Sequence, residues 1–180
     1  MNPSVNKLIP TLERQAEADC EVPASPLPIF EYIDRPERLS AHMERRSWRT
    51  GGGTMTIETD GGGGRAVGSR MRLAGRVLGI DLAVEGEVTE RKPPYRKAWQ
   101  TVGDPRLLVV GAYRMEVTID KRGTGSHVRI AIDYALPSDG LSRWLGTLFG
   151  AMYARWCVKQ MIEDVRQRFA GGSPSVARLQ

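Results

Sequence analysis

The chain has 180 residues, of which 41% are hydrophobic and 26% charged, and a formal net charge of +5. These values are ordinary for one globular domain, and a chain of this length can bury a sizeable core. Acids are interleaved with the bases along the predicted strands, so no nucleic acid partner is expected. The longest apolar run, Leu107–Val110, is too short for a transmembrane segment, and no secretory signal is expected at the N-terminus.

The chain contains only two cysteines, Cys20 in a predicted strand and Cys157 in a predicted helix. Both are most simply interpreted as small buried hydrophobic residues. A disulfide between them is an alternative, but reduced cysteines and a cytoplasmic location fit this sparse usage better.

A single domain is predicted at residues 15–170, between an N-terminal tail at 1–14 and a C-terminal tail at 171–180. Its first strand is predicted at 15–22, because apolar residues alternate there. The apolar face of this strand carries Ala16, Ala18, Cys20 and Val22.

Two short helices are predicted after this strand. Ser25 can cap the first, which has a proline at its first position and runs to about Ile33. Pro36 opens the second, predicted at 37–43. A weak strand at 54–60 follows, bracketed by glycines on both sides.

The segments 70–77 and 80–88 each alternate in polarity, which predicts two strands joined by a two-residue turn. In that register, charged residues of opposite sign face one another on one side of the sheet. The pairs are Arg70–Glu87, Arg72–Glu85 and Arg76–Asp81. Three such pairs predict a wet outer face, while the same register stacks the apolar residues on a dry inner face.

Three further strands are predicted at 95–103, 106–119 and 127–136. Asp104 and Pro105 are expected to form the turn between the first two, and a glycine-containing loop at 121–126 joins the last two.

The last two of these strands have a register of their own, in which Ile119 pairs with Val128 and apolar residues align on the inner face. The same register gives two further pairs, Tyr113–Tyr134 on the dry face and Arg114–Asp133 on the wet face.

One long helix is predicted at 142–169, because apolar residues recur there at spacings of three and four. Aromatic residues widen the apolar stripe until little polar surface remains between Leu145 and Val158. A helix of this kind is expected to be held by a concave partner. A curved sheet can supply that partner and leave a cavity between sheet and helix.

The order of the elements indicates an α+β fold, in which a curved antiparallel sheet of about seven strands grips a long C-terminal helix, with two short helices after the first strand. Three segments carry a resemblance to a known superfamily: CEVPASPLPIFEYIDRPERLSAHM, VGSRMRLAGRVLGIDLAVEGEVTERKPPYRKAWQTVG and IDYALP…WLGTLFGAMYARWCVKQMIEDVRQRF. The chain resembles the helix-grip (SRPBCC-like) superfamily over about residues 15–170. That superfamily includes START lipid-transfer domains, the birch-pollen-allergen family and polyketide cyclases/dehydrases.

This resemblance implies an apolar cavity between the concave sheet and the long helix. Members of the superfamily bind lipids, sterols, isoprenoid quinones or polyketides there, and a minority catalyse cyclisation or dehydration. The implied partner of this chain is therefore a hydrophobic small molecule, and no cofactor is expected. Because the matching segments are architectural, the resemblance implies a class of function and not a particular reaction.

Inward-facing strand positions and one side of the long helix supply the candidate ligand-binding residues. They are Leu82, Val84, Trp99, Tyr113, Met115, Val117, Ile130, Ile132, Tyr134, Phe149, Met152, Tyr153 and Trp156. Among them, Tyr113 and Tyr134 are the best candidates to orient a ligand oxygen, because a buried tyrosine hydroxyl usually has a hydrogen-bond partner. Filling space is the alternative role for both.

No catalytic residue or metal site is identified. A general acid or base is expected on the dry face, where burial raises a carboxyl pKa, but the strand acids all fall on the wet face. These acids are Asp81, Glu85, Glu87, Glu116, Asp120 and Asp133. His42 and His127 lie far apart in the sequence and have no zinc-ligand spacing. The glycine-rich stretch 61–68 lacks the lysine of a phosphate-binding loop and precedes a strand, so a flexible loop is expected.

Three functions fit these observations. The first is binding or transport of a lipid, isoprenoid or polyketide-like molecule in the cavity. The second is a cyclase or dehydratase that uses the same cavity. The third is an interaction module, in which the sheet or the apolar helix docks a protein or a membrane.

Overall fold

The computed structural model describes residues 11–39, 54–77, 80–138 and 140–170. The strands are β1 (Arg14–Val22), β2 (Thr54–Thr59), β3 (Arg70–Val77), β4 (Ile80–Lys92), β5 (Arg96–Arg106), β6 (Tyr113–Arg122) and β7 (Gly125–Tyr134). The helices are α1 (Pro26–Ile33), α2 (Pro36–Leu39) and α4 (Gly140–Ala170). This is the α+β order that the sequence predicts.

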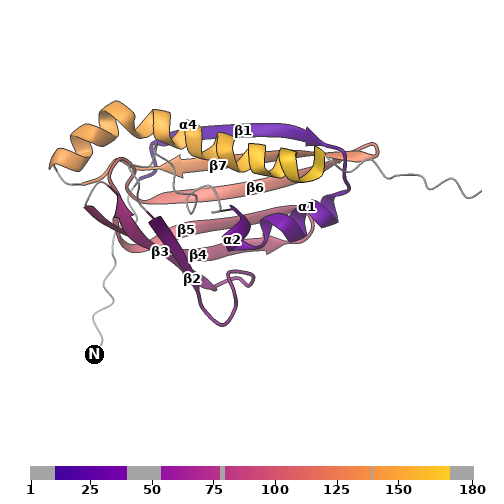
Figure 1. The fold of residues 1–180 in the computed structure, drawn as a ribbon, viewed down its shortest axis with the longest axis horizontal. Helices are drawn as coiled ribbons and strands as arrows, with labels where there is room; N and C mark the ends of the chain where they lie inside the picture. The colour runs from indigo at the N-terminus through magenta and orange to yellow at the C-terminus, as the bar shows by residue number, and fades with distance from the viewer. Residues whose placement is uncertain (1–10, 40–53, 78–79, 139, 171–180) are drawn as a thin grey trace, which may run out of the picture.

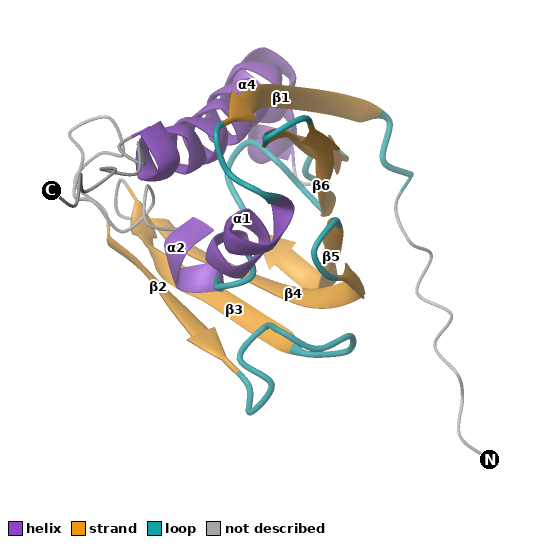
Figure 2. Cartoon of the chain, turned by 90° about the vertical axis from the view of Figure 1, so that its right-hand side faces the viewer, coloured by secondary structure: helices purple, strands orange, loops and turns teal. Residues whose placement is uncertain are grey.

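The strands form one antiparallel sheet in the order β1-β7-β6-β5-β4-β3-β2. Among the pairings of the described sheet, only β1–β7 joins strands that are distant in the chain. Helix α4 packs along β1 and β7 (Figure 1), while α1 packs on β6. Figure 2 shows that the sheet curves and that the helices lie on its concave side.

The register predicted for β3 and β4 is confirmed, and residues 78–79 of its turn lie outside the described residues. The opposed pairs are Arg70–Glu87, Arg72–Glu85 and Arg76–Asp81. The Arg76 guanidinium lies 2.7 Å from the Asp81 carboxylate. Arg70 reaches both Glu85, at 3.1 Å, and Glu87, at 3.4 Å. These ion pairs are accessible to solvent, so they specify the register more than they stabilise the fold.

The register predicted for β6 and β7 is also confirmed, with Ile119 opposite Val128 and Tyr113 opposite Tyr134. The turn between them is shorter than expected, because the pairing continues to Arg122 and Gly125. Gly123 adopts a φ of +55° in this turn, a backbone conformation that residues with a side chain rarely adopt.

The prediction for residues 104–112 was wrong. Asp104 and Pro105 belong to β5, and a loop at 107–112 precedes β6. The pairing of β4 with β5 shifts register between Ala83 and Glu85, which marks a β-bulge in β5. Gly103, at φ +73°, lies in this bulge. A bulge also accommodates a proline, because the proline has no N–H to give to the sheet ladder.

Helix α4 confirms the long helix predicted at 142–169, but the way it packs was not foreseen. Its buried face in the first half consists of small residues: Gly146, Gly150 and Ala154. A Cβ atom added at Gly146 or Gly150 would lie 2.9 or 2.8 Å from the carbonyl oxygen of Val109. The helix therefore lies directly on the backbone of the 107–112 loop, and large apolar side chains of its first half, such as Trp144 and Leu148, are exposed.

The N-terminal elements follow the prediction with two differences. Ser25 occupies the N-cap position of α1 but makes no side-chain capping hydrogen bond. Helix α2 is described only to Leu39, so the rest of the helix predicted at 37–43, including His42, lies outside the described residues. Both cysteines are free thiols, so the alternative of a disulfide is not realised. Within the described residues, no helix is apolar over a long enough stretch to cross a membrane.

Candidate functional site

The concave face of the sheet is an apolar surface built by strand alternation. Residues opposite one another form rows across the sheet, and one row crosses five strands. The successive partners from β4 to β1 are Val88, Trp99, Met115, Ile132 and Ala16. Because alternate residues of a strand face the same side, the neighbouring rows face this side as well. One of them contains Lys97 beside Val117 and Ile130, and the other contains the Tyr113–Tyr134 pair.

The structure buries all but one of the strand residues proposed for the ligand site. They are Leu82, Val84, Trp99, Met115, Val117, Ile130, Ile132 and Tyr134. Tyr113 is the exception, since it is only partly buried. It stands opposite Tyr134 at the end of the β6–β7 ladder, next to the loop that supports α4.

The helix residues proposed for the site separate into two groups. Tyr153 and Trp156 are partly buried against the core, with their ring centroids 5.8 Å apart. Phe149 is 39% exposed, and Met152 is 63% exposed. Met152 therefore lies on the outer side of α4, and the prediction that it walls a cavity is not supported by its position.

Tyr113, Tyr153 and Cys157 form a cluster beneath the middle of α4. Burial raises the pKa of both tyrosines above the ordinary range, and Cys157 raises each further. Burial also raises the pKa of the Cys157 thiol to about 12, so this group stays protonated at neutral pH. Both tyrosines are only partly buried, and neither hydroxyl is among the fully buried polar atoms that lack a hydrogen-bond partner. The backbone N–H of Tyr113 donates to the Thr101 hydroxyl at 3.1 Å, so Thr101 positions this end of β6.

A second, polar cluster lies where α1 ends. The Lys97 side chain is 2% exposed, and its ammonium donates to the Asp34 carboxylate at 2.8 Å. It also donates to the backbone carbonyls of Asp34, at 2.9 Å, and Gly64, at 2.7 Å. Burial lowers the pKa of Lys97, whereas the bond to Asp34 acts against this shift. All three ammonium hydrogens have acceptors, so Lys97 ties the sheet to the α1–α2 corner and the glycine-rich loop.

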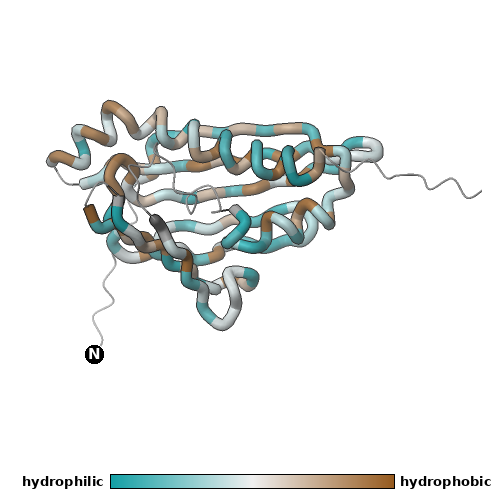
Figure 3. The backbone as a smooth tube through the Cα atoms, viewed as in Figure 1, coloured by the Kyte–Doolittle hydropathy of each residue, from teal (hydrophilic) through white to brown (hydrophobic). Residues whose placement is uncertain are grey.

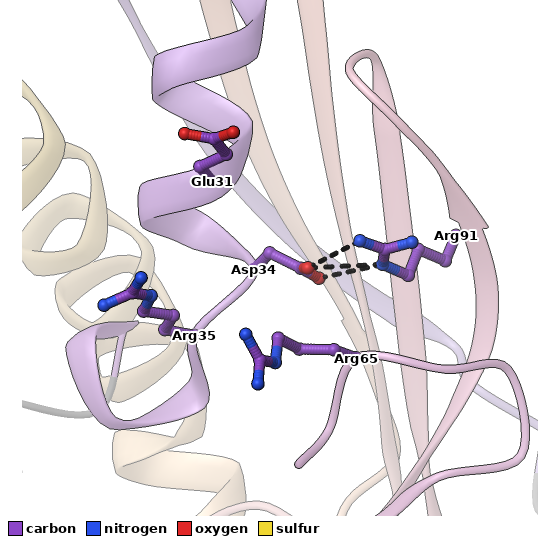
Figure 4. A pocket seen from close by; sticks show the side chains of 5 residues that line it. All are labelled: Glu31, Asp34, Arg35, Arg65 and Arg91. Carbon is purple, nitrogen blue, oxygen red and sulfur yellow. Dashed lines mark hydrogen bonds and ion pairs between the residues drawn. The ribbon is translucent and has the colours of Figure 1, made fainter. Parts of the chain in front are cut away.

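A hollow of about 440 Å³ lies beside this cluster. Figure 4 shows the side chains that line it, which are Glu31, Asp34, Arg35, Arg65 and Arg91. Arg91 binds the Asp34 carboxylate with two nitrogens, at 2.9 and 3.2 Å. Within the described part of the chain, Arg35 and Arg65 have no acidic partner. The corner therefore carries more positive than negative charge, which favours an anionic group. Lys97 could be placed on the dry face from the sequence, but Asp34 and Arg91 were missed because their contact joins residues 57 positions apart.

Residues 13–170 match the model of a family described as polyketide cyclase/dehydrase and lipid transport. The chain belongs to this family. The helix-grip resemblance seen in the sequence is thereby confirmed. No curated protein matches the sequence.

Solved structures agree with this family fold. TTHA0849 of Thermus thermophilus is similar at a TM-score of 0.63 and 14% identity, over 89% of this chain and 99% of that one. A point mutant of norcoclaurine synthase of Thalictrum flavum, in complex with a transition state analogue, has a TM-score of 0.58 and 14% identity, over 87% of this chain and 94% of that one. Ara h 8.0201 has a TM-score of 0.57 and 9% identity, over 87% of this chain and 97% of that one. At these identities the similarity shows the fold alone.

A cyclase or dehydrase of this family would need a group that takes up or gives a proton, and the strand acids do not supply one on the concave face. Asp81, Glu85, Glu87 and Glu116 make ion pairs with arginines. Their alternation places them on the convex face, opposite the buried apolar residues. His127 is also on that side, 3.0 Å from Glu21.

Two further kinds of site can be compared with the described residues: a metal cluster and a phosphate-binding glycine loop. No cluster of histidine, cysteine and acidic residues suited to a metal occurs in the described residues. The glycine-rich loop uses its backbone N–H groups internally: Gly62 donates to Asp60 and Gly64 to Ser69, both at 2.9 Å. The Ser69 hydroxyl bond lowers the pKa of Asp60. The loop is thus a hydrogen-bonded turn and not a phosphate cradle.

Proposed function

We propose that this family member binds a hydrophobic small molecule, of the lipid, isoprenoid or polyketide-like class, between the concave face of the sheet and α4. Membership of a family described by lipid transport supports this class of ligand. The apolar row Val88, Trp99, Met115 and Ile132, which crosses β4, β5, β6 and β7, supplies the kind of wall that such a ligand needs.

The observation that carries the proposal is the position of the Tyr113 and Tyr153 hydroxyls at the edge of the core. Both lie deep enough for burial to raise their pKa. Both side chains also keep some accessible surface. A tyrosine hydroxyl at the edge of an apolar core needs a hydrogen-bond partner, which a ligand or water can supply.

The protonation states of the same groups favour a binding role over a catalytic one. With raised pKa values, the tyrosines are hydrogen-bond donors at neutral pH and not bases. Cys157 is protonated, and the Lys97 ammonium is fully engaged. In this proposal Tyr113 and Tyr153 orient an oxygen of the ligand, and the apolar row holds its hydrocarbon part.

Equilibrium titration with a fluorescent long-chain fatty acid tests this proposal. Wild-type protein should bind, and Tyr113→Phe or Tyr153→Phe should weaken binding by about tenfold, or about 1.4 kcal/mol, because each removes one hydrogen bond. Tyr95→Phe is the matched control, since Tyr95 is exposed on the surface. Val84→Trp should abolish binding by filling the site while leaving the circular dichroism spectrum unchanged.

No uptake by wild-type protein would contradict the proposal. Uptake that Val84→Trp leaves unchanged would place the ligand elsewhere. Conversion of a bound substrate during the titration, detected by mass spectrometry, would favour the cyclase or dehydratase alternative.

A further inference from the structure

The first half of α4 exposes a line of large apolar side chains, Leu141, Trp144, Leu148 and Met152, which we name the outer stripe. These four are between 58 and 73% exposed. Their spacing of three, four and four residues puts them on one side of the helix. Single exposed apolar residues are common on protein surfaces, but four in a row on one helix face mark an interaction surface.

The packing of α4 makes this exposure permanent. Gly146 and Gly150, on the opposite side of the helix, lie against the carbonyl oxygen of Val109 with no room for even a Cβ atom. A rotation of α4 that buried Trp144 or Leu148 would force large side chains into this contact. The outer stripe therefore cannot enter the core without moving the helix away from the 107–112 loop.

The charges on α4 complement the outer stripe. From residue 141 to residue 162 the helix contains no acid and three bases, Arg143, Arg155 and Lys159. Arg155 and Lys159 are exposed and follow Met152 by three and seven residues, so they continue the same face. Figure 3 shows hydrophobic residues gathered in the first half of α4 and hydrophilic ones in the second. The first acid, Glu163, is engaged by Arg166 at 2.8 Å.

We propose that the outer stripe docks this protein on an anionic lipid membrane, with Trp144, Leu148 and Met152 in the interface and Arg155 and Lys159 on the lipid headgroups. A helix with an apolar face beside basic residues is typical of segments that lie in the plane of a membrane interface. Tryptophan favours this region because its ring is apolar and its N–H is polar.

A second copy of the chain fits this face less well. Two outer stripes placed together would leave Arg155 and Lys159 without an acidic partner, because residues 141–162 contain no acid. An anionic membrane pairs with both basic side chains and also accommodates the apolar ones. The inference does not depend on the proposed ligand site, because it concerns the opposite side of α4.

Co-sedimentation of the full chain with vesicles tests the docking surface. Vesicles of phosphatidylcholine with about 30% phosphatidylglycerol should bind the protein, and pure phosphatidylcholine should bind it more weakly. Trp144→Ser with Leu148→Ser should lower partitioning by at least about tenfold on the anionic vesicles. Arg155→Gln with Lys159→Gln should reduce it by about thirtyfold there and leave phosphatidylcholine binding unchanged. Leu27→Ser, an exposed leucine on α1, is the matched control and should have no effect.

The result that would overturn the proposal is binding equal in all variants, or no binding by wild-type protein. A halved mass on removing Trp144 and Leu148, measured by sedimentation equilibrium without lipid, would assign the stripe to a second copy instead. Should the serine variants fold poorly, quenching of wild-type tryptophan emission by brominated lipids gives an independent answer, because a docked Trp144 must be quenched.

Discussion

Lys97 shows how a charge is kept in the core of this domain. Its ammonium is surrounded by three acceptors, of which one is the Asp34 carboxylate and two are backbone carbonyls. Removal from water disfavours the charged form, and the hydrogen bonds compensate for that cost. The same lysine joins three parts of the chain, because Asp34 follows α1 and Gly64 belongs to the glycine-rich loop.

Lys97→Met tests this structural role. Methionine keeps most of the volume but leaves the carbonyls of Asp34 and Gly64 without a donor, so unfolding free energy should fall by about 2–3 kcal/mol. Lys92→Met, which removes a surface ion pair with Glu90, should change it by less than about 0.5 kcal/mol. Urea denaturation measures both. Equal stability of the two variants would mean that the Lys97 contacts contribute nothing net.

The raised pKa of Tyr153 predicts a dependence of stability on alkaline pH. Above about pH 10 the unfolded chain loses the tyrosine proton while the folded chain retains it, so the folded state binds more protons and stability falls as pH rises. Tyr153→Phe removes this effect. The stability of wild type relative to Tyr153→Phe should be constant below pH 9 and should then fall by up to about 1.4 kcal/mol per pH unit above pH 10. Urea denaturation of both proteins at each pH measures this difference in stability. If the difference stays constant up to pH 11, the Tyr153 hydroxyl reaches water in the folded state.

At the scale of elements, α4 has two faces with different roles. The face of Gly146 and Gly150 sets how closely the helix approaches the 107–112 loop, and the outer stripe lies on the other side. The sequence predicts the helix and its length from periodicity alone. It does not predict which side is buried, because hydrophobicity ranks Trp144 and Leu148 above glycine, whereas close backbone contact requires glycine.

Gly150→Ala tests this contact. In an exposed helix interior the substitution would stabilise by about 1 kcal/mol, because alanine has the higher helix propensity. Here the new Cβ would lie 2.8 Å from the carbonyl oxygen of Val109, a backbone atom, so we expect a net loss of about 1–2 kcal/mol. Gly140→Ala, where nothing lies within 4 Å, should be neutral within about 0.5 kcal/mol. Thermal denaturation of both variants decides it, and a stabilised Gly150→Ala would contradict the close approach.

The sheet could be predicted from the sequence where residue pairs on facing strands constrain the register. Opposite charges on Arg76 and Asp81 fixed the register of β3 and β4, since a shift by one residue would move every side chain to the other face. No such signal existed at 107–112, where four consecutive apolar residues fit a strand and a packed loop equally well. For the site, alternation predicted the buried strand residues, but it could not show that Met152 lies outside.

At the scale of the molecule, α4 stands between the two proposed sites. Tyr153 and Trp156 lie on its partly buried side, next to the apolar sheet, and Met152 lies on its exposed side. The helix packs along β1 and β7, at one edge of the curved sheet, so one helix can form both a wall of the ligand site and the contact with a membrane. A ligand could then pass between membrane and protein without crossing much water.

This arrangement predicts how a bound fluorescent fatty acid is transferred from the protein to vesicles. If docking precedes release, the transfer rate should rise with vesicle concentration and with the fraction of anionic lipid, because the protein must collide with the membrane. Arg155→Gln with Lys159→Gln should slow transfer to anionic vesicles by at least about tenfold, since each basic side chain contributes about 1 kcal/mol near such a surface. The affinity for the fatty acid should be unchanged, whereas Tyr153→Phe should weaken affinity and leave the dependence on anionic lipid intact. Stopped-flow fluorescence with vesicles that carry a quencher measures the rate. A rate independent of vesicle concentration would mean that the ligand leaves through water, and the two sites would then act separately.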